Sequence, residues 1–195
     1  MSVIMKYTYK TDRLILRIIE PNISDAEKIL DFQLRNDDLF QRYEPVHSEN
    51  FFTVDHQVKL LEAEHNAALR SSLIRFWVFL RDDPENLIAT VSFRNITFNF
   101  QYSCKIGYKL DAAYFHHGYM TEAVKKGVDI MFTECGLHRI VATIMPENLP
   151  SIRLARRVGF QYEGTERKSN LVNGRWEDHE RWAIINPGEW GSSED

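Results

Sequence analysis

The stretch Tyr114-Phe115-His116-His117-Gly118-Tyr119-Met120-Thr121-Glu122-Ala123 decides how the rest of the chain is interpreted. It follows an alternating strand pattern and opens an amphipathic helix, so it predicts a glycine-bearing turn between a strand and a helix N-terminus. Such a turn gathers free backbone N–H groups at the positive end of the helix dipole, which suits a phosphate or pyrophosphate. Because many helices begin near a glycine and bind nothing, the neighbouring elements must decide between an anion site and a plain turn.

The composition is that of a globular protein, with 195 residues, 44% apolar and 27% charged residues, and a net charge of −4. It predicts a single domain over residues 1–195 that ends in a tail at about 187–195. No basic stripe indicates a nucleic-acid partner, and no apolar window is long enough to cross a membrane. Cys104 and Cys135 are too far apart for a ligand cluster, and the N-terminus lacks a signal-peptide pattern. We therefore expect a cytoplasmic protein that binds no metal.

The periodicity along the chain predicts a mixed α/β (α+β) protein. Helices are expected at about 24–35, 53–70, 120–135 and 148–158, and strands at 13–19, 75–80, 87–96, 102–110, 138–145, 160–172 and 175–185. Asn173-Gly174 is a strong hairpin signal, and the strand at 138–145 is apolar on both faces, as in the middle of a sheet. Strands joined by hairpins around one strand–helix–strand unit predict a mixed sheet. Cys135 is expected to be a core residue of its helix.

Several short strings in this order are similar to those of a known family. They are Thr11-Asp12-Arg13-Leu14, Tyr43-Glu44-Pro45-Val46, Ile106-Gly107-Tyr108-x-Leu110, Gly118-Tyr119-Met120-x-Glu122-Ala123, His138-Arg139-Ile140, Asn148-x-x-Ser151, Gly159-Phe160-x-x-Glu163-Gly164 and Asn173-Gly174-x-Trp176-x-Asp178-His179. The chain resembles the GNAT acyl-CoA-dependent N-acetyltransferases, and within them the ribosomal-protein-alanine acetyltransferases of the RimJ/RimL type. The resemblance implies a twisted mixed sheet of about seven strands, with about four helices on both faces and splayed central strands.

The resemblance also implies acetyl-CoA as donor, with its pyrophosphate on the backbone amides of the opening stretch. The residues concerned are Phe115, His116, His117, Gly118, Tyr119, Met120 and Thr121. Phe115 and Met120 depart from the family pattern, but main-chain N–H groups hold the phosphates, so we expect binding to survive. The two histidines either add donors to the phosphates or are solvated loop residues. Tyr108, Lys109 and Leu110 are assigned to the pantetheine arm, largely through their main chain, and Asn148 either orients that arm or caps its own helix.

The family's chemistry is the direct attack of an amine on a thioester, followed by departure of a thiolate. Many members use a tyrosine as acid at the position that is Ala155 here. Enzymes of the RimL type offer instead a serine at the position of Ser151, which we therefore expect to protonate the thiolate. The alternative is a serine that only hydrogen-bonds the first turn of its helix or CoA.

The base is less well defined by the resemblance. The RimL-type glutamate position is Asn170 here, and an amide cannot accept the proton. Glu44 lies in a segment that lines the acceptor site in the family, so it is the preferred base; otherwise it is a surface carboxylate or binds the ammonium form of the substrate. Asp178, His179 and a water relay are the other candidates.

The expected partners are acetyl-CoA and a primary amine, and the implied activity is acetylation of a protein N-terminal α-amine. An α-amino group, with a pKa of about 7.7–8.0, is partly neutral near pH 7, which favours attack. Two alternatives remain. The acceptor could be a small amine such as a polyamine, an aminoglycoside antibiotic or an amino-acid-like metabolite, or the chain could be a non-catalytic acyl-CoA sensor. Exposed strand edges at the final hairpin allow a monomer or a homodimer.

Overall fold

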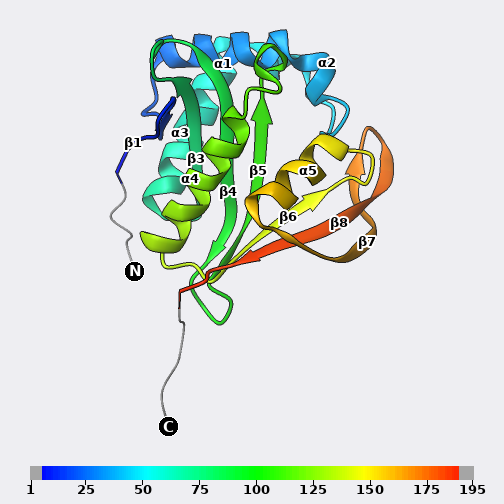
Figure 1. Ribbon diagram of the computed structural model, residues 1–195. Coiled ribbons are helices and arrows are strands. Elements are labelled where there is room, and N and C mark those ends of the chain that lie inside the picture. Colours follow the sequence, from blue (N-terminus) through cyan, green and yellow to red (C-terminus); the bar gives the residue numbers. More distant parts are fainter. Residues whose placement is uncertain (1–5, 189–195) are drawn as a thin grey trace.

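A computed structural model describes residues 6–188 as one eight-stranded sheet with helices on both faces (Figure 1). The strands are β1 (Thr8–Lys10), β2 (Leu14–Arg17), β3 (Leu73–Leu80), β4 (Leu87–Thr97), β5 (Ser103–Leu110), β6 (Arg139–Ile144), β7 (Gln161–Val172) and β8 (Arg175–Ile185). The helices are α1 (Ile23–Arg35), α2 (Asp37–Phe40), α3 (Val54–Leu69), α4 (Tyr119–Thr133) and α5 (Leu149–Val158), with 3₁₀ turns at Glu49–Phe52 and Ala112–Tyr114.

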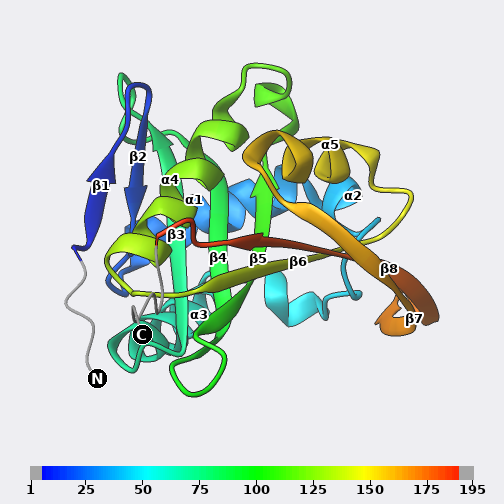
Figure 2. The same cartoon turned by 60° about the horizontal axis from the view of Figure 1, so that its bottom comes forward.

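The strand order is β1-β2-β3-β4-β5-β6-β8-β7, and every neighbouring pair is antiparallel except β5 and β6. Figure 2 shows β1 and β2 at one edge of this sheet and the β7–β8 hairpin at the other. At the hairpin turn Asn173 and Gly174 both have positive φ, 48° and 75°, as a two-residue type I′ turn requires. The predicted mixed sheet is therefore confirmed.

One strand, one α-helix and the two 3₁₀ turns escaped the sequence prediction, so the sheet has one strand more than expected. β1 has three residues, of which only Tyr9 is buried, and such a run is too short to show an alternation. α2 is a single turn inside the segment that looks irregular in the sequence. The residues 189–195 of the predicted C-terminal tail lie outside the described part of the chain.

The two faces of the sheet are covered by different helices, α4 and α5 on one side and α1 and α3 on the other (Figure 1). The α4 face packs tightly: a Cβ on Gly127 would stand 2.9 Å from the ring of Phe93, so this glycine brings the helix directly onto β4. Cys135 is buried in the same core, as predicted. On the other face a second core joins Phe32, Leu61 and Phe79. No helix within residues 6–188 has the length and apolar composition needed to cross a bilayer.

The two parallel strands separate halfway along their length. β5 pairs with β6 only from Ser103 to Ile106, opposite Arg139 to Ala142. Beyond that point residues 107–110 of β5 pair only with β4 on their other side, and the strands diverge (Figure 1). Backbone groups on the inner edge of β5 are thus left without a strand partner. This confirms the predicted splay of the central strands.

Candidate active site

The stretch from Tyr114 to Ala123 forms an anion-binding cradle at the N-terminus of α4. Gly118 is the N-cap and adopts a left-handed conformation with φ +80°, which a residue with a side chain rarely takes. The backbone N–H groups of residues 119–121 have no hydrogen-bond acceptor in residues 6–188. Free amides at the positive end of a 15-residue helix suit a pyrophosphate, so these residues fit the diphosphate of CoA.

A network from the start of the chain fixes the cradle. Glu122 accepts hydrogen bonds from Thr11 Oγ1 (2.6 Å), Arg13 N (3.0 Å) and Arg13 Nε (2.7 Å). Partial burial acts in the opposite direction, but these donors lower the pKa of Glu122 below its usual range. Arg13 Nη1 also donates to the carbonyl of His117 at 2.9 Å. Arg13 therefore ties β2 to the loop, a role that the string Thr11-Asp12-Arg13 signalled but did not explain.

The two loop histidines differ in their surroundings. His117 Nδ1 donates to the carbonyl of Phe115 at 2.7 Å, and its ring stacks on Tyr119. His116 is exposed, with a positive φ of 66°. Arg157 on α5 adds a cation beside the cradle, because its Nη1 donates to Thr121 Oγ1 at 3.3 Å. A phosphate contact from either histidine stays a prediction.

Two hydroxyl groups lie near the splay, that of Ser151 at the start of α5 and that of Tyr108 on β5. Asn148 caps the helix, since its side-chain oxygen accepts from Ser151 N at 3.2 Å. Ser151 Oγ has no hydrogen-bond partner among the described residues, while the Ser151 carbonyl accepts from the Tyr108 hydroxyl at 3.3 Å. Burial raises the pKa of Tyr108 to about 12, although the hydrogen bond to Ser151 opposes this, so the phenol stays protonated. Ala155, where a tyrosine was expected in related enzymes, is buried in the core.

A cavity of about 680 Å³ opens on the α3 face of the sheet, behind residues 107–110 of β5. Its walls come from α1, α3, residues 43–51, β3 to β6 and the β7–β8 hairpin. Lys109 and Glu44 both line it, and Lys109 Nζ lies 2.6 Å from Glu44 Oε2. Burial lowers the pKa of Lys109, while the Glu44 carboxylate opposes that shift. The side chain of Lys109 thus belongs to the cavity, whereas the sequence assigned this residue to the donor site through its main chain.

The other predicted bases divide between the cavity and the surface. His179 lines the cavity, as does Asn170, whose amide cannot act as a base; Asp178 does not line it, and its carboxylate accepts from Lys168 N at 2.9 Å. His179 is 5% exposed, and its Nδ1 donates to the carbonyl of Glu177 at 3.2 Å. A neutral His179 therefore carries its lone pair on Nε2. Glu44 and His179 are the two predicted bases that the fold brings to one cavity.

Three charged residues of the cavity were missed by sequence reasoning. Arg75 Nε lies 3.1 Å from Glu64 Oε1, and burial raises the pKa of Glu64 although Arg75 opposes this. A Cβ on Gly107 would stand 3.1 Å from Arg94 Nη2, so the glycine leaves room for that guanidinium. One signal was available: Arg75 interrupts a strand that is otherwise apolar.

The cavity wall holds polar atoms without partners. Buried side-chain nitrogen and oxygen atoms that make no hydrogen bond are few in residues 6–188, and five of these seven line the cavity. They are His47 Nε2, Glu64 Oε2, Arg75 Nε, Thr90 Oγ1 and Ser169 Oγ. Buried polar groups are almost always satisfied, so this wall fits a polar ligand. No group of His, Cys, Asp and Glu side chains in the described part of the chain could hold a metal ion.

Comparison with known proteins agrees with this geometry. A family model described as "Acetyltransferase (GNAT) domain" matches residues 13–161. The probable N-acetyltransferase YjcK of Bacillus subtilis is 39% identical over 165 residues, 85% of this chain and 91% of that protein. The ribosomal-protein-S5-alanine acetyltransferase of Vibrio fischeri has a TM-score of 0.88 and 31% identity over 95% of this chain and 100% of its own. Mycobacterium smegmatis RimJ, solved in complex with CoA-disulfide, has a TM-score of 0.81 and 27% identity over 88% and 81% of the two chains.

The chain belongs to the GNAT acetyltransferase family. It is an N-acetyltransferase that takes its acetyl group from acetyl-CoA, which confirms the donor implied by the sequence. Its relatives include ribosomal-protein-alanine acetyltransferases of the RimJ/RimL type.

Proposed function

We propose that the chain acetylates the N-terminal α-amine of a protein. The observation that carries this is the 680 Å³ polar cavity behind residues 107–110, which lies across the sheet from the phosphate cradle. A cavity of this size accommodates the first residues of a peptide. The similarity to an acetyltransferase for the alanine of ribosomal protein S5 supports a ribosomal protein as acceptor.

On the donor side, each predicted residue binds or positions one part of acetyl-CoA. The amides of residues 119–121 hold the pyrophosphate, and the free edge of β5 at Tyr108, Lys109 and Leu110 hydrogen-bonds the pantetheine arm. Asn148 keeps the start of α5 in place through its cap. The acetyl group is thereby presented at the splay, between the cradle and the cavity.

On the acceptor side, Glu44 receives the proton of the incoming amine. The amine enters from the cavity, attacks the thioester carbonyl and forms the amide bond directly, without an acyl-enzyme. Positioning the two reactants supplies much of the acceleration. Lys109, 2.6 Å from Glu44, holds the carboxylate in place. Proton transfer to a placed base contributes about 10²–10⁴-fold.

Ser151 protonates the departing thiolate. Its hydroxyl has no competing partner in residues 6–188, and the cap formed with Asn148 fixes its position on α5. The Tyr108 phenol, which donates to the Ser151 carbonyl, holds this turn against β5.

The cavity does not favour a polyamine or an aminoglycoside as acceptor. A polycationic ligand requires a wall with excess carboxylates, whereas Arg75, Arg94 and Lys109 face two carboxylates, Glu44 and Glu64. An amino-acid-like amine remains as the second acceptor class, because its carboxylate suits these cations.

Intact-mass screening of N-terminal peptides and small amines with acetyl-CoA tests the proposal. We expect a gain of one acetyl group on the α-amine of an alanine-starting peptide. Acetylation confined to small amines would contradict the acceptor, and thiol release with none of the amines would support a sensor. The variants Glu44→Gln and Ser151→Ala should each lower kcat/KM about 100-fold, with Glu62→Gln on the exposed side of α3 as control. If both stayed within twofold of the wild type, the assigned proton transfers would be wrong.

A further inference from the structure

The cavity wall formed by the sheet carries two guanidinium groups close together. β3, β4 and β5 are in register so that Arg75, Ser92 and Gly107 stand opposite one another, and Trp77, Thr90 and Lys109 form the next row. Side chains directly opposite one another in a sheet lie on the same face, as do those two residues apart. Arg94 lies in the row before these, opposite Leu73 and Lys105. Its guanidinium extends over Gly107, where an added Cβ would stand 3.1 Å from Nη2. Both arginines therefore face the cavity from adjacent rows.

Neither guanidinium is fully paired within the described part of the chain. Arg75 Nε lies 3.1 Å from Glu64 Oε1 but makes no hydrogen bond, and the guanidinium lies over the ring of Trp77 at 5.4 Å. Arg94 is exposed and has no hydrogen bond or ion pair with any of the residues 6–188. Desolvation at the wall lowers the pKa of Arg94, and the positive charge of Arg75 lowers it further. An anion between the two would relieve this repulsion.

A second observation at the same place points to a ligand. Thr90 is 3% exposed, lines the cavity, and its hydroxyl has no hydrogen-bond partner. Arg75 Nε and Glu64 Oε2 make no hydrogen bond on the same wall, although Arg75 Nε lies 3.1 Å from Glu64 Oε1. Thr90 stands directly opposite Lys109, and Arg75 lies in the next row, so this buried hydroxyl can donate to an acceptor oxygen of a ligand bound there.

We propose that Arg75 and Arg94 bind an acidic side chain at the second or third residue of the acceptor N-terminus. This inference rests on the proposed function, since it specifies the peptide that enters the same cavity. The distance agrees with it. The row of Lys109, beside Glu44, and the row of Gly107 are two residues apart on β5, or about 6.6 Å. An α-amine at Glu44 places the side chain of its next residues, at about 3.8 Å per Cα step, near the arginines.

The test compares peptides that differ in one charge. Each starts with alanine and carries glutamate or glutamine at position two, or at position three, in an otherwise identical sequence. We expect the wild type to acetylate the better glutamate peptide with about tenfold higher kcat/KM than its glutamine counterpart, since a guanidinium–carboxylate pair is a strong hydrogen-bonded contact. The variants Arg75→Gln and Arg94→Gln should bring this ratio toward one, and Arg94→Lys should keep part of it.

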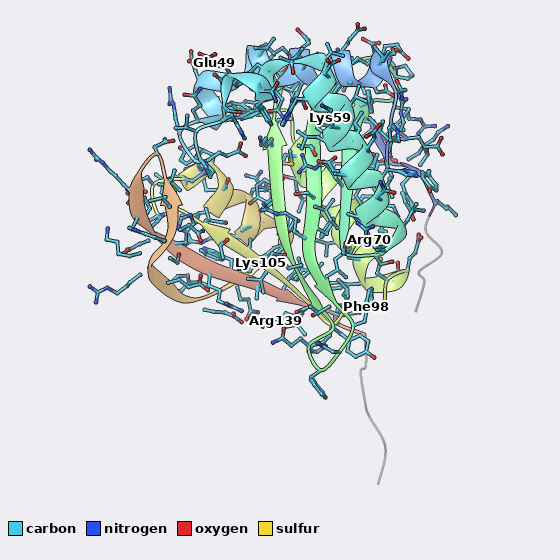
Figure 3. All side chains as sticks on the ribbon, turned by 180° about the vertical axis from the view of Figure 1, so that it is seen from behind. Glu49, Lys59, Arg70, Phe98, Lys105 and Arg139 are labelled. Carbon is cyan, nitrogen blue, oxygen red and sulfur yellow. The ribbon has the colours of Figure 1, made fainter. Side chains whose placement is uncertain are left out.

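Lys105→Gln is the matched control. Lys105 lies on β5 opposite Arg94, is exposed and does not line the cavity. The substitution Lys105→Gln therefore removes one positive charge from the same face of the sheet without changing the cavity. Figure 3 views the sheet from the α3 side, with Lys105 in the lower half of the picture and Glu49 at the top. The control should keep the tenfold ratio. Circular dichroism of every variant would separate loss of preference from loss of fold.

Three results would overturn the inference, and the one that also overturns the proposed function is distinguishable from the other two. Equal kcat/KM for glutamate and glutamine peptides in the wild type, or a ratio that survives both arginine substitutions, overturns the inference and leaves the proposed function intact. Acetylation of none of the peptides overturns the proposed function and the inference with it.

Discussion

On the α4 face of the sheet the groups free to meet a ligand belong mainly to the backbone, with the Ser151 hydroxyl as an exception, whereas on the α3 face they are side chains. The cradle consists of the amides of residues 119–121 and the left-handed Gly118, and the splay adds the unpaired edge of β5. The cavity presents Glu44, Arg75 and Lys109, with hydroxyl and imidazole groups between them. The first arrangement suits a co-substrate shared by a family; the second suits an acceptor that differs between family members.

The two faces also differ in packing. α4 touches β4 through Gly127, while the opposite face is hollow and has five buried polar atoms without a hydrogen bond, of which Arg75 Nε and His47 Nε2 still lie near a carboxylate. Unsatisfied buried groups lower stability, typically by about 1–3 kcal/mol each. We therefore expect the α3 face, the proposed acceptor face, to carry a stability cost that the α4 face, the donor face, does not, so that Gly127→Ala and Thr90→Val should change stability in opposite directions.

The largest expected effect is that of Gly127→Ala on the donor face. An alanine inside an open helix would stabilise it by about 1 kcal/mol relative to glycine. Here the new Cβ would meet Phe93 at 2.9 Å, so we expect destabilisation of about 1–3 kcal/mol in urea unfolding. Adding Phe93→Leu, which removes the contacting ring edge, should recover part of the loss. A Gly127→Ala variant more stable than the wild type would contradict the close approach.

Gly118→Val should weaken CoA binding about tenfold. Valine at φ +80° costs about 1–2 kcal/mol and would shift the amides of residues 119–121. Calorimetric titration with CoA measures the change. Gly174→Val is the control, because its φ is +75° in a hairpin turn with nothing within 4 Å of the new Cβ. That variant should lose stability and keep its CoA affinity; equal CoA affinity in both variants would argue against the cradle.

Thr90→Val on the acceptor face should raise stability by about 1 kcal/mol, because it removes a buried hydroxyl without a partner. Thr97→Val on the same strand is the matched opposite: its Oγ1 donates to the carbonyl of Ser103 at 3.4 Å, so stability should fall. Thermal unfolding of the two variants gives the comparison. A loss of stability in both would show that the Thr90 hydroxyl is satisfied.

The smallest expected effect is the pH dependence at Glu64. Burial raises the pKa of this carboxyl in the folded state, so the folded protein holds a proton more readily than the unfolded chain. The stability associated with this group is therefore full below its unfolded pKa and is lost as pH rises through the folded pKa. Glu64→Gln has no such group to deprotonate and does not lose this stability as pH rises. The Tm of the variant relative to the wild type should therefore increase from acid to neutral pH. Glu62→Gln, on the exposed side of α3, should follow the wild type throughout.

The local structure of the donor face was predictable because its signals are local, while the CoA contacts assigned to it stay predictions. A glycine before an amphipathic helix, a capping asparagine three residues before a serine, and an Asn-Gly hairpin are read within a few residues of each other. The fold followed from the same kind of pattern; only β1 and α2, of three and four residues, are too short to produce one.

The acceptor face could not be predicted in the same way, because register decides it. Arg75, Arg94 and Gly107 meet only when β3, β4 and β5 pair as they do. Asp178 and His179 are neighbours in sequence, but successive residues of a strand point to opposite faces, and only His179 reaches the cavity. Glu64 lies on the same stripe of α3 as Leu61 and Ala68. This spacing would identify it as a cavity residue only if a charged side chain were expected on the inner face of the helix.

The division between the two faces is tested most directly by one pair of measurements on Glu44→Gln and Gly118→Val. These are the Kd for CoA and the transfer rate to an alanine-starting peptide at saturating acetyl-CoA. We expect Glu44→Gln to bind CoA like the wild type and to transfer about 100-fold more slowly. We expect Gly118→Val to bind CoA about tenfold more weakly and to lose far less of its transfer rate. Glu44→Gln with weakened CoA binding, or with wild-type transfer, would contradict the account.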